Sequence, residues 1–358
     1  MSRVHNFSAG PAVLPLSVVE QLQAALPDFQ GTGLGLMELS HRSETFDAVH
    51  RSAEDRLRRL LGVPDDYAVL FLQGGASLQF HMVPTNLLGE GESADFIVTG
   101  VWTKKALVEA QRSRSAKAIF SGDPNGYRSL PETIAPSANA TYLHYTTNNT
   151  IYGTQFHQTP DVGSVPLVAD MSSDICSRPI DVAAHAVIFA GAQKNLGPSG
   201  VTAVILSPWA LEKSGGDLNP MLDYRLQAEK RGLFNTPNTF GIYALERVLA
   251  WVEDLGGMSG MQARNKAKAD ALYQQIDSTD FWTGHADRSC RSEMNVAFQA
   301  PSDDLNAAFV AQADAAGLKG LKGHRSVGGL RASIYNACPM QSVEALVGFM
   351  ADFEKDNG

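Results

Sequence analysis

The hydrophobic positions of this chain alternate between short apolar runs and longer segments with helical spacing. Runs typical of buried strands occupy residues 67–72, 95–99, 116–120, 140–144, 165–169, 187–190 and 201–206. Apolar residues at helical spacing predict helices from about residue 16, over 46–61, 78–88, 241–255 and 258–276. Because strands and helices alternate, we predict an α/β fold with a mainly parallel, doubly wound sheet flanked by helices.

Three segments interrupt this alternation. Residues 1–15 read as an arm, 31–39 as a Gly-rich link without regular structure, and 211–231 as a polar, irregular stretch. After about residue 277 the pattern changes to that of a compact α+β unit, with strands near 296–299 and around 317–332 and a last helix from Gln341. We therefore predict a large domain over residues 16–260 and a smaller one formed by 261–358 together with the arm 1–15.

Composition narrows the class of protein. The 358 residues carry a formal net charge of −9 without a long basic run, which argues against nucleic acid or an anionic membrane as a partner. No apolar run approaches the roughly 18 residues of a membrane span, and residues 1–15 lack a signal-peptide pattern, so we expect a cytoplasmic protein. Cys176, Cys290 and Cys338 have no metal-ligand spacing and are predicted to be free thiols.

The strand over 67–72 runs directly into Gly74-Gly75-Ala76-Ser77 and then into a predicted helix. A small-residue turn before a helix N-terminus can hold a phosphate, because unpaired N–H groups and the helix dipole point toward it. The spacing matches neither the dinucleotide fingerprint nor the NTP-binding P-loop. A plain tight βα turn is an equally good interpretation of this segment alone.

Three further side chains follow predicted strands. Trp102 comes just after the strand at 95–99, Asp170 ends the strand at 165–169, and Lys194 lies in a Gly-rich turn between the strands at 187–190 and 201–206. Each also has a purely structural interpretation: Trp102 could cap the core, Asp170 could form an Asp turn or cap a helix, and Lys194 could be a solvated turn residue. Together with the phosphate cradle they are what pyridoxal 5′-phosphate requires, namely a ring stacker, a partner for the pyridinium nitrogen and a Schiff-base lysine.

Longer motifs identify a family. The segments FSAGPAVLP, LSHR, FLQGGAS, ADMSSDICSRPID, AGAQKNLGPSG, FNTPNTF and LKGHRSVGGLRASIYNA follow one another from Phe7 to Ala337. In content, order and spacing the chain resembles the phosphoserine aminotransferases, a class V family of pyridoxal-phosphate enzymes of fold type I. The resemblance implies a homodimer with shared active sites and one pyridoxal phosphate per subunit.

The resemblance also implies the reaction. It is reversible, ping-pong transfer of the amino group of L-glutamate to 3-phosphohydroxypyruvate, giving O-phospho-L-serine and 2-oxoglutarate in serine biosynthesis. A four-carbon acid of vitamin B6 synthesis, 3-hydroxy-2-oxo-4-phosphobutanoate, presents the same carboxylate, ketone and phosphate. Two interpretations therefore stay open, in which the enzyme accepts the three-carbon acid alone or both acids.

The same resemblance assigns roles to individual residues. It makes Lys194 the Schiff-base lysine and catalytic base, pairs Asp170 with the pyridinium nitrogen and stacks Trp102 on the ring. The other implied cofactor contacts are Ala76, Ser77, Thr150, Gln193, Asn235 and Thr236, of which Asn235 and Thr236 would reach the cofactor phosphate of the neighbouring subunit. The implied substrate-binding residues are His41, Arg42, His324, Arg325 and Arg331, with Arg331 as the clamp for the α-carboxylate.

Two departures and three alternatives accompany this interpretation. Some family members carry Arg at the position of Ser77, so we expect one fewer cation for the substrate phosphate. A glutamate is frequent at the position of Asn149, and there we expect a local change only.

A cysteine desulfurase would need a cysteine within 323–329, where none occurs, and Cys338 follows that segment. Serine–glyoxylate-type aminotransferases should lack the doubled His-Arg pairs. In a phosphosugar-binding protein or other α/β enzyme without this cofactor, Lys194 would be only a turn residue.

Overall fold

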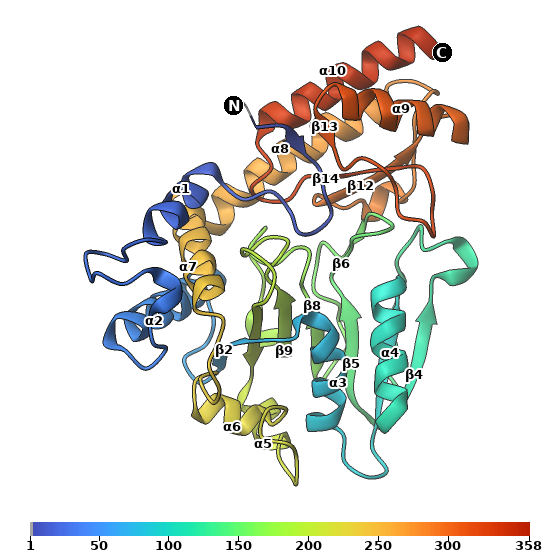
Figure 1. The fold of residues 1–358 in the computed structure, drawn as a ribbon. Helices are drawn as coiled ribbons and strands as arrows, with labels where there is room; N and C mark the ends of the chain where they lie inside the picture. Colours follow the sequence, from blue (N-terminus) through green and yellow to red (C-terminus); the bar gives the residue numbers. More distant parts are fainter. Residues whose placement is uncertain (1–2) are drawn as a thin grey trace.

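A seven-stranded sheet forms the centre of the molecule, which the computed structural model describes over residues 3–358 (Figure 1). The strand order is β2-β10-β9-β8-β5-β3-β4, and β10 runs antiparallel to both of its neighbours while the other strands share one direction. The strands are β2 (Ala68–Leu72), β3 (Ser93–Val98), β4 (Ser115–Ser121), β5 (Ala140–Thr146), β8 (Leu167–Asp170), β9 (His185–Gly191) and β10 (Thr202–Leu206). The predicted mainly parallel sheet is confirmed.

Helices cover both faces of this sheet because its strands are apolar on both sides. Along β2, Val69 and Phe71 pack into one hydrophobic cluster, whereas Leu70 and Leu72 pack into another. The first cluster includes residues of α1 (Leu16–Ala25), α2 (Glu44–Leu61) and α7 (Thr239–Asp254), and the second includes residues of α3 (Gly75–Leu87) and α4 (Val101–Ser113). This arrangement is the predicted doubly wound α/β architecture.

A third hydrophobic cluster lies in the C-terminal part of the chain, seen at the top of Figure 1. It is formed by α8 (Gly257–Asp277), α9 (Asp303–Ala315), α10 (Met340–Asn357) and the sheet β11-β12-β14, whose strands are Thr283–Gly284, Asn295–Gln299 and Leu330–Ser333. The arm joins this unit, since β1 (His5–Asn6) pairs with β13 (Leu318–Lys319) and Phe7 is fully buried in the cluster. Helix α8 runs unbroken through residues 260 and 261, so the two-domain boundary placed there stays a prediction.

The predicted irregularity of 211–231 is wrong. Helix α5 (Pro208–Lys213) enters this segment and α6 (Tyr224–Glu229) lies within it. The side chains of Ser207 and Asp223 cap them by accepting N–H groups of their first turns. Helices of this length are too short for apolar periodicity to reveal.

Two other boundaries differ from the sequence interpretation. The link at 31–39 contains a 3₁₀ turn, η1 (Leu36–Glu38), and α3 starts at Gly75 rather than at Leu78. Gly74 makes the early start possible, because its φ of 88° turns the chain sharply out of β2. The small-residue segment is therefore the first turn of the helix itself. The remaining short elements are β6 (Asn148–Asn149), β7 (Thr154–Gln155), η2 (Asp123–Asn125), η3 (Val182–Ala184) and η4 (Arg288–Cys290).

The three cysteines are free thiols, as predicted, and all three are buried. Within residues 3–358, no group of three or more His, Cys, Asp or Glu side chains could hold a metal ion. None of the helices in that range combines the length and apolar character that a membrane span requires.

The aromatic centre of the third cluster yields a stability prediction. Phe309 is fully buried, with its ring centroid 5.2 Å from that of Trp282 and 5.1 Å from that of Phe353. Replacing it with alanine leaves a cavity, so Phe309→Ala should lower the free energy of unfolding by about 3–5 kcal/mol, measured by urea denaturation followed by circular dichroism. Val108→Ala, at a residue 46% exposed on α4, is the control and should change it by no more than about 0.5 kcal/mol. Equal effects of the two substitutions would contradict the packing role of Phe309.

Candidate active site

The candidate residues gather at one edge of the central sheet. Strands β3, β5, β8 and β9 run parallel, so their carboxyl ends lie at one edge of the sheet. Strand β2 ends at the same edge, because β2 and β9 are both antiparallel to β10 and therefore share one direction. Open α/β sheets bind ligands at this edge. The segments that follow these strands carry the first turn of α3, Trp102, Thr150, Asp170 and Lys194.

Lys194 lies in the turn between β9 and β10 and points its amine at two predicted partners. Its Nζ donates a hydrogen bond to Thr150 Oγ1 at 2.7 Å and lies 5.9 Å from the centroid of the Trp102 ring. Burial lowers the pKa of Lys194 to about 8, although the nearby Asp170 carboxylate acts in the opposite direction. A larger fraction of the amine than in an exposed lysine is therefore neutral, and so nucleophilic, near neutral pH.

Asp170 is the last residue of β8 and is buried. Its Oδ1 accepts the Ser172 backbone N–H at 2.9 Å, and no Lys, Arg or His nitrogen of the described chain lies within 4 Å of the carboxylate. Burial raises the pKa of this carboxyl group. A buried carboxylate without an ion-pair partner is costly, so this position suits a cationic atom supplied by a ligand.

The N-terminal end of α3 is open toward the same edge. Ala76 and Ser77 lie in its first turn, which has no side-chain cap and no acidic residue. Its free N–H groups and its dipole are available to an anion. The preceding Gln73 contacts both residues of another predicted pair, accepting a hydrogen bond from Asn235 Nδ2 at 3.2 Å and donating one to the Thr236 carbonyl at 3.1 Å.

Arg331 brings a cation from the C-terminal unit. It lies on β14 and donates from Nη1 to the Thr150 carbonyl at 3.3 Å, while its buried Nε has no hydrogen-bond partner among residues 3–358. Burial lowers the pKa of Arg331 from its usual value. The guanidinium therefore keeps donor capacity for a ligand close to the Lys194 amine.

The turn that precedes β14 adds His324 and Arg325. Burial lowers the pKa of His324, and the nearby positive charges of Arg331, Arg325 and Lys105 lower it further. Lys105 belongs to α4, and its Nζ lies 4.5 Å from the centroid of the Trp102 ring. The charge of Lys105, next to the Trp102 ring, thus acts on the turn that carries His324 and Arg325.

His41 and Arg42 are placed differently. Both lie in the turn between η1 and α2, where His41 is half-buried and Arg42 exposed. Across residues 3–358, neither side chain hydrogen-bonds to another predicted site residue, and the Arg42 backbone N–H donates to Ser40 Oγ at 3.2 Å. Within the described part of one chain, His41 and Arg42 are therefore not linked to the turn that carries His324 and Arg325.

The N-terminal arm also contacts the Lys194 turn, which was not predicted from the sequence. Ala12 N–H donates to the Gln193 carbonyl at 2.9 Å, and a Cβ at Gly10 would lie 3.5 Å from Lys194 Cγ. The buried Tyr335 hydroxyl donates to the Ala9 carbonyl at 2.8 Å and so connects the arm with the C-terminal unit. Nothing in the spacing of these residues indicates the contact, which depends on the β1–β13 pairing.

Two other residues near the site, Lys105 and Asp174, were not predicted from the sequence, and the structure also shows the contacts of Asn149, which stands where the family frequently has a glutamate. Lys105 follows Trp102 by three helical positions, a spacing from which their contact could have been expected. Asp174 is a second buried carboxylate, which accepts a hydrogen bond from Gln155 Nε2 at 3.2 Å and has a raised pKa through burial. Asn149 donates to the Thr99 and Thr154 hydroxyls, both at 3.1 Å, so its effect is the expected local one.

Comparisons with known proteins agree with this geometry. The family model described as aminotransferase class-V matches residues 4–346. The chain is 52% identical to the phosphoserine aminotransferase of Desulfatibacillum aliphaticivorans, with 100% of this chain and 99% of that protein covered. The solved phosphoserine aminotransferase of Bacillus circulans subsp. alkalophilus superposes with a TM-score of 0.97 at 49% identity, covering 99% of both chains. The PLP-bound phosphoserine aminotransferase of Trichomonas vaginalis gives a TM-score of 0.92 at 39% identity, covering 98% of this chain and 100% of that one.

The environment of Lys194 predicts an unusual titration. An amine-reactive reagent labels only the neutral amine, so labelling of Lys194 in cofactor-free protein should rise with a midpoint near pH 8, followed by peptide mass spectrometry. Lys266 is the internal control, because its exposed ion pair with Asp270 raises its pKa. Added pyridoxal phosphate should protect Lys194 and leave Lys266 reactive. A Lys194 midpoint as high as that of Lys266 would contradict the effect of burial.

Proposed function

The chain belongs to the phosphoserine aminotransferases of aminotransferase class V, which use pyridoxal phosphate, and we propose that it transfers the amino group of L-glutamate to 3-phosphohydroxypyruvate. The observation that carries this proposal is the buried Lys194 amine beside Trp102 and the unpaired Asp170 carboxylate. The four-carbon acid 3-hydroxy-2-oxo-4-phosphobutanoate carries the same reacting groups and is proposed as a second acceptor.

The residues at the sheet edge fit pyridoxal phosphate. Asp170 forms no ion pair within 4 Å among residues 3–358 and would pair with the pyridinium nitrogen, while the Trp102 ring would cover the face of the cofactor. The uncapped first turn of α3, with Ala76 and Ser77, would hold the phosphate. The remaining contacts that we propose are Thr150 for the ring oxygen and Gln193, Asn235 and Thr236 for the phosphate.

The chemistry divides between cofactor and chain. Bound pyridoxal phosphate supplies a reactive carbonyl carbon and a ring that withdraws electrons from the substrate Cα. Lys194 provides the amine that holds the cofactor and, once free, the base that removes the proton from the substrate Cα. Thr150 orients this amine through the 2.7 Å hydrogen bond, and Asp170 keeps the ring nitrogen protonated. The arm at Gly10 and Ala12 closes one side of the lysine and limits access of water.

Cations explain how an acidic protein binds an acidic substrate. Arg331 is proposed as the clamp for the α-carboxylate, because its Nε has no hydrogen-bond partner in the described part of the chain and its Nη1 already donates to the Thr150 carbonyl. His324 and Arg325 are proposed to take the substrate phosphate or the γ-carboxylate of glutamate. His41 and Arg42 are proposed to contribute to the same anion site.

The assembly proposed for this enzyme is a homodimer with shared active sites in the cytoplasm. Support comes from the exposed Thr236 and half-buried Asn235, which follow Phe234, itself 42% exposed. A second chain contacting this segment would bring the pair to the cofactor phosphate of its neighbour. We also propose that residues 16–260 form the cofactor domain, and that 1–15 with 261–358 form the smaller one.

Removing the lysine tests the proposed function directly. Lys194→Ala should lower turnover of L-glutamate with 3-phosphohydroxypyruvate by at least about 10³-fold while retaining bound pyridoxal phosphate. Borohydride should fix the cofactor covalently to Lys194 of the unaltered protein, identified by peptide mass spectrometry, and to no residue of the variant. A protein that takes up no pyridoxal phosphate, or a variant with full turnover, would refute the proposal.

Removing the carboxylate clamp tests substrate binding. Arg331→Ala should lower kcat/KM for L-glutamate by about 10- to 100-fold, because a charge-assisted pair of hydrogen bonds is lost, while the cofactor absorption stays unchanged. Arg112→Ala is the matched control, since Arg112 is exposed on α4 and forms an ion pair with Glu109 of the same helix. Unchanged glutamate kinetics in Arg331→Ala would exclude this residue from the substrate site.

A further inference from the structure

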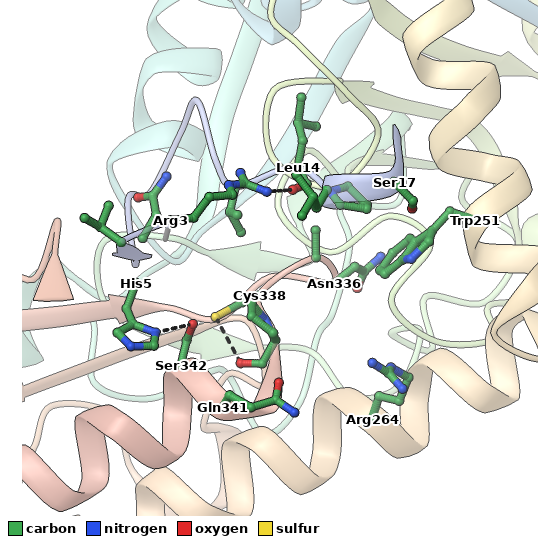
Figure 2. Close-up of a pocket in the computed structure, with 17 residues that line it drawn as sticks. Arg3, His5, Leu14, Ser17, Trp251, Arg264, Asn336, Cys338, Gln341 and Ser342 are labelled. Atoms are coloured by element: carbon green, nitrogen blue, oxygen red, sulfur yellow. Dashed lines mark hydrogen bonds between the residues drawn. The ribbon is translucent and has the colours of Figure 1, made fainter. Parts of the chain in front are cut away.

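A second cavity lies away from the sheet edge, between the N-terminal arm and the start of α10 (Figure 2). We name it the arm pocket and define it by Arg3, His5, Leu14, Trp251, Arg264 and Ser342, which are among its lining residues. Its volume of about 470 Å³ is that of a site for a small molecule. None of the residues proposed for the transamination site lines it.

The charge of the arm pocket is one-sided. Two arginines and a histidine line it, and none of the described lining residues carries a carboxylate, although the whole chain has a formal charge of −9. Neither arginine has an ion-pair partner within 4 Å among residues 3–358, where 18 such pairs are found. Such a set of uncompensated cations around a cavity favours an anionic ligand.

The two arginines line the pocket from different elements of the chain. Figure 2 shows Arg264 rising from α8 toward the space between Trp251 and Gln341, while Arg3 approaches from the opposite side of the pocket. Arg3 Nη1 donates to the Leu14 carbonyl at 3.2 Å, and the Arg3 side chain makes no other hydrogen bond within residues 3–358.

Further polar side chains line the pocket where the arm meets α10. His5 Nδ1 of β1 and Ser342 Oγ of α10 lie 2.9 Å apart in a hydrogen bond. The first turn of α10 has no side-chain cap and no acidic residue, so its N–H groups add to the positive potential that the arginines create. Trp251, Val13 and Leu14 provide an apolar wall between these polar groups.

From this arrangement we propose that the arm pocket is a second ligand site, separate from the transamination site, which binds a small organic dianion. The two arginines hold its acidic groups, and the Trp251 side of the wall contacts its hydrocarbon part. The dianion would lie between two segments that also contact the Lys194 turn, since Ala12 N–H donates to the Gln193 carbonyl and Asn336 N–H to Asn195 Oδ1 at 3.1 Å.

Calorimetric titration of the pyridoxal-phosphate-loaded protein with succinate tests this proposal, with acetate as the singly charged comparison. Succinate should bind saturably below about 10 mM and acetate more weakly. Arg264→Gln should weaken succinate binding by about tenfold or more, because a charged donor is lost. Lys266→Gln removes a cation from the same helix outside the pocket and should leave succinate binding within about twofold of the original.

The Arg331→Ala protein separates the arm pocket from the transamination site. Succinate binding that persists in Arg331→Ala and is lost in Arg264→Gln supports the proposal. Binding lost in Arg331→Ala and unaffected by Arg264→Gln would place succinate in the transamination site and overturn the proposal, while leaving the proposed function intact. No saturable binding, or equal losses in Arg264→Gln and Lys266→Gln, would also overturn it.

Discussion

Burial of the Lys194 amine is the constraint on which the candidate site depends. Removing an ammonium group from water disfavours its charged form, and only the Asp170 and Asp174 carboxylates act in the opposite direction. The surroundings therefore maintain a lysine that is both held in place by Thr150 and easily deprotonated. A solvated turn lysine would have neither property, which separates this site from the ordinary interpretation of the turn.

The parallel strands determine where this lysine meets its partners. Each of β3, β5, β8 and β9 is followed by one functional segment at its carboxyl end, and helices pack on both faces of the sheet. The Lys194 turn joins β9 to the antiparallel β10, which lies next to it in the same sheet. Fully buried strands therefore hold the lysine on both sides of the turn. The first turn of α3 and Trp102 at the start of α4 then face this anchored group from helices that follow β2 and β3.

Much of this arrangement could be predicted from the sequence because strand ends and Gly-rich turns are local signals. The positions of Asp170, Lys194 and the Gly74–Ser77 segment follow from apolar runs and the residues right after them. The capped helices α5 and α6 were missed because they are too short to show periodicity. Contacts of the arm with Gln193 and Tyr335 were missed for another reason, since they join residues far apart in the chain and no local pattern encodes them.

The arm also has a consequence for the order in which the site can be completed. During synthesis Gly10 and Ala12 leave the ribosome long before their partners, because β1 pairs with β13 and the Ala9 carbonyl accepts a hydrogen bond from Tyr335, more than 300 residues later. The central sheet can assemble around Lys194 before these partners exist, because β2 to β10 precede them. A nascent or C-terminally truncated chain would therefore present a lysine open to solvent on its arm side. Enclosure of the amine is a property that the polypeptide acquires only when its last strands have formed.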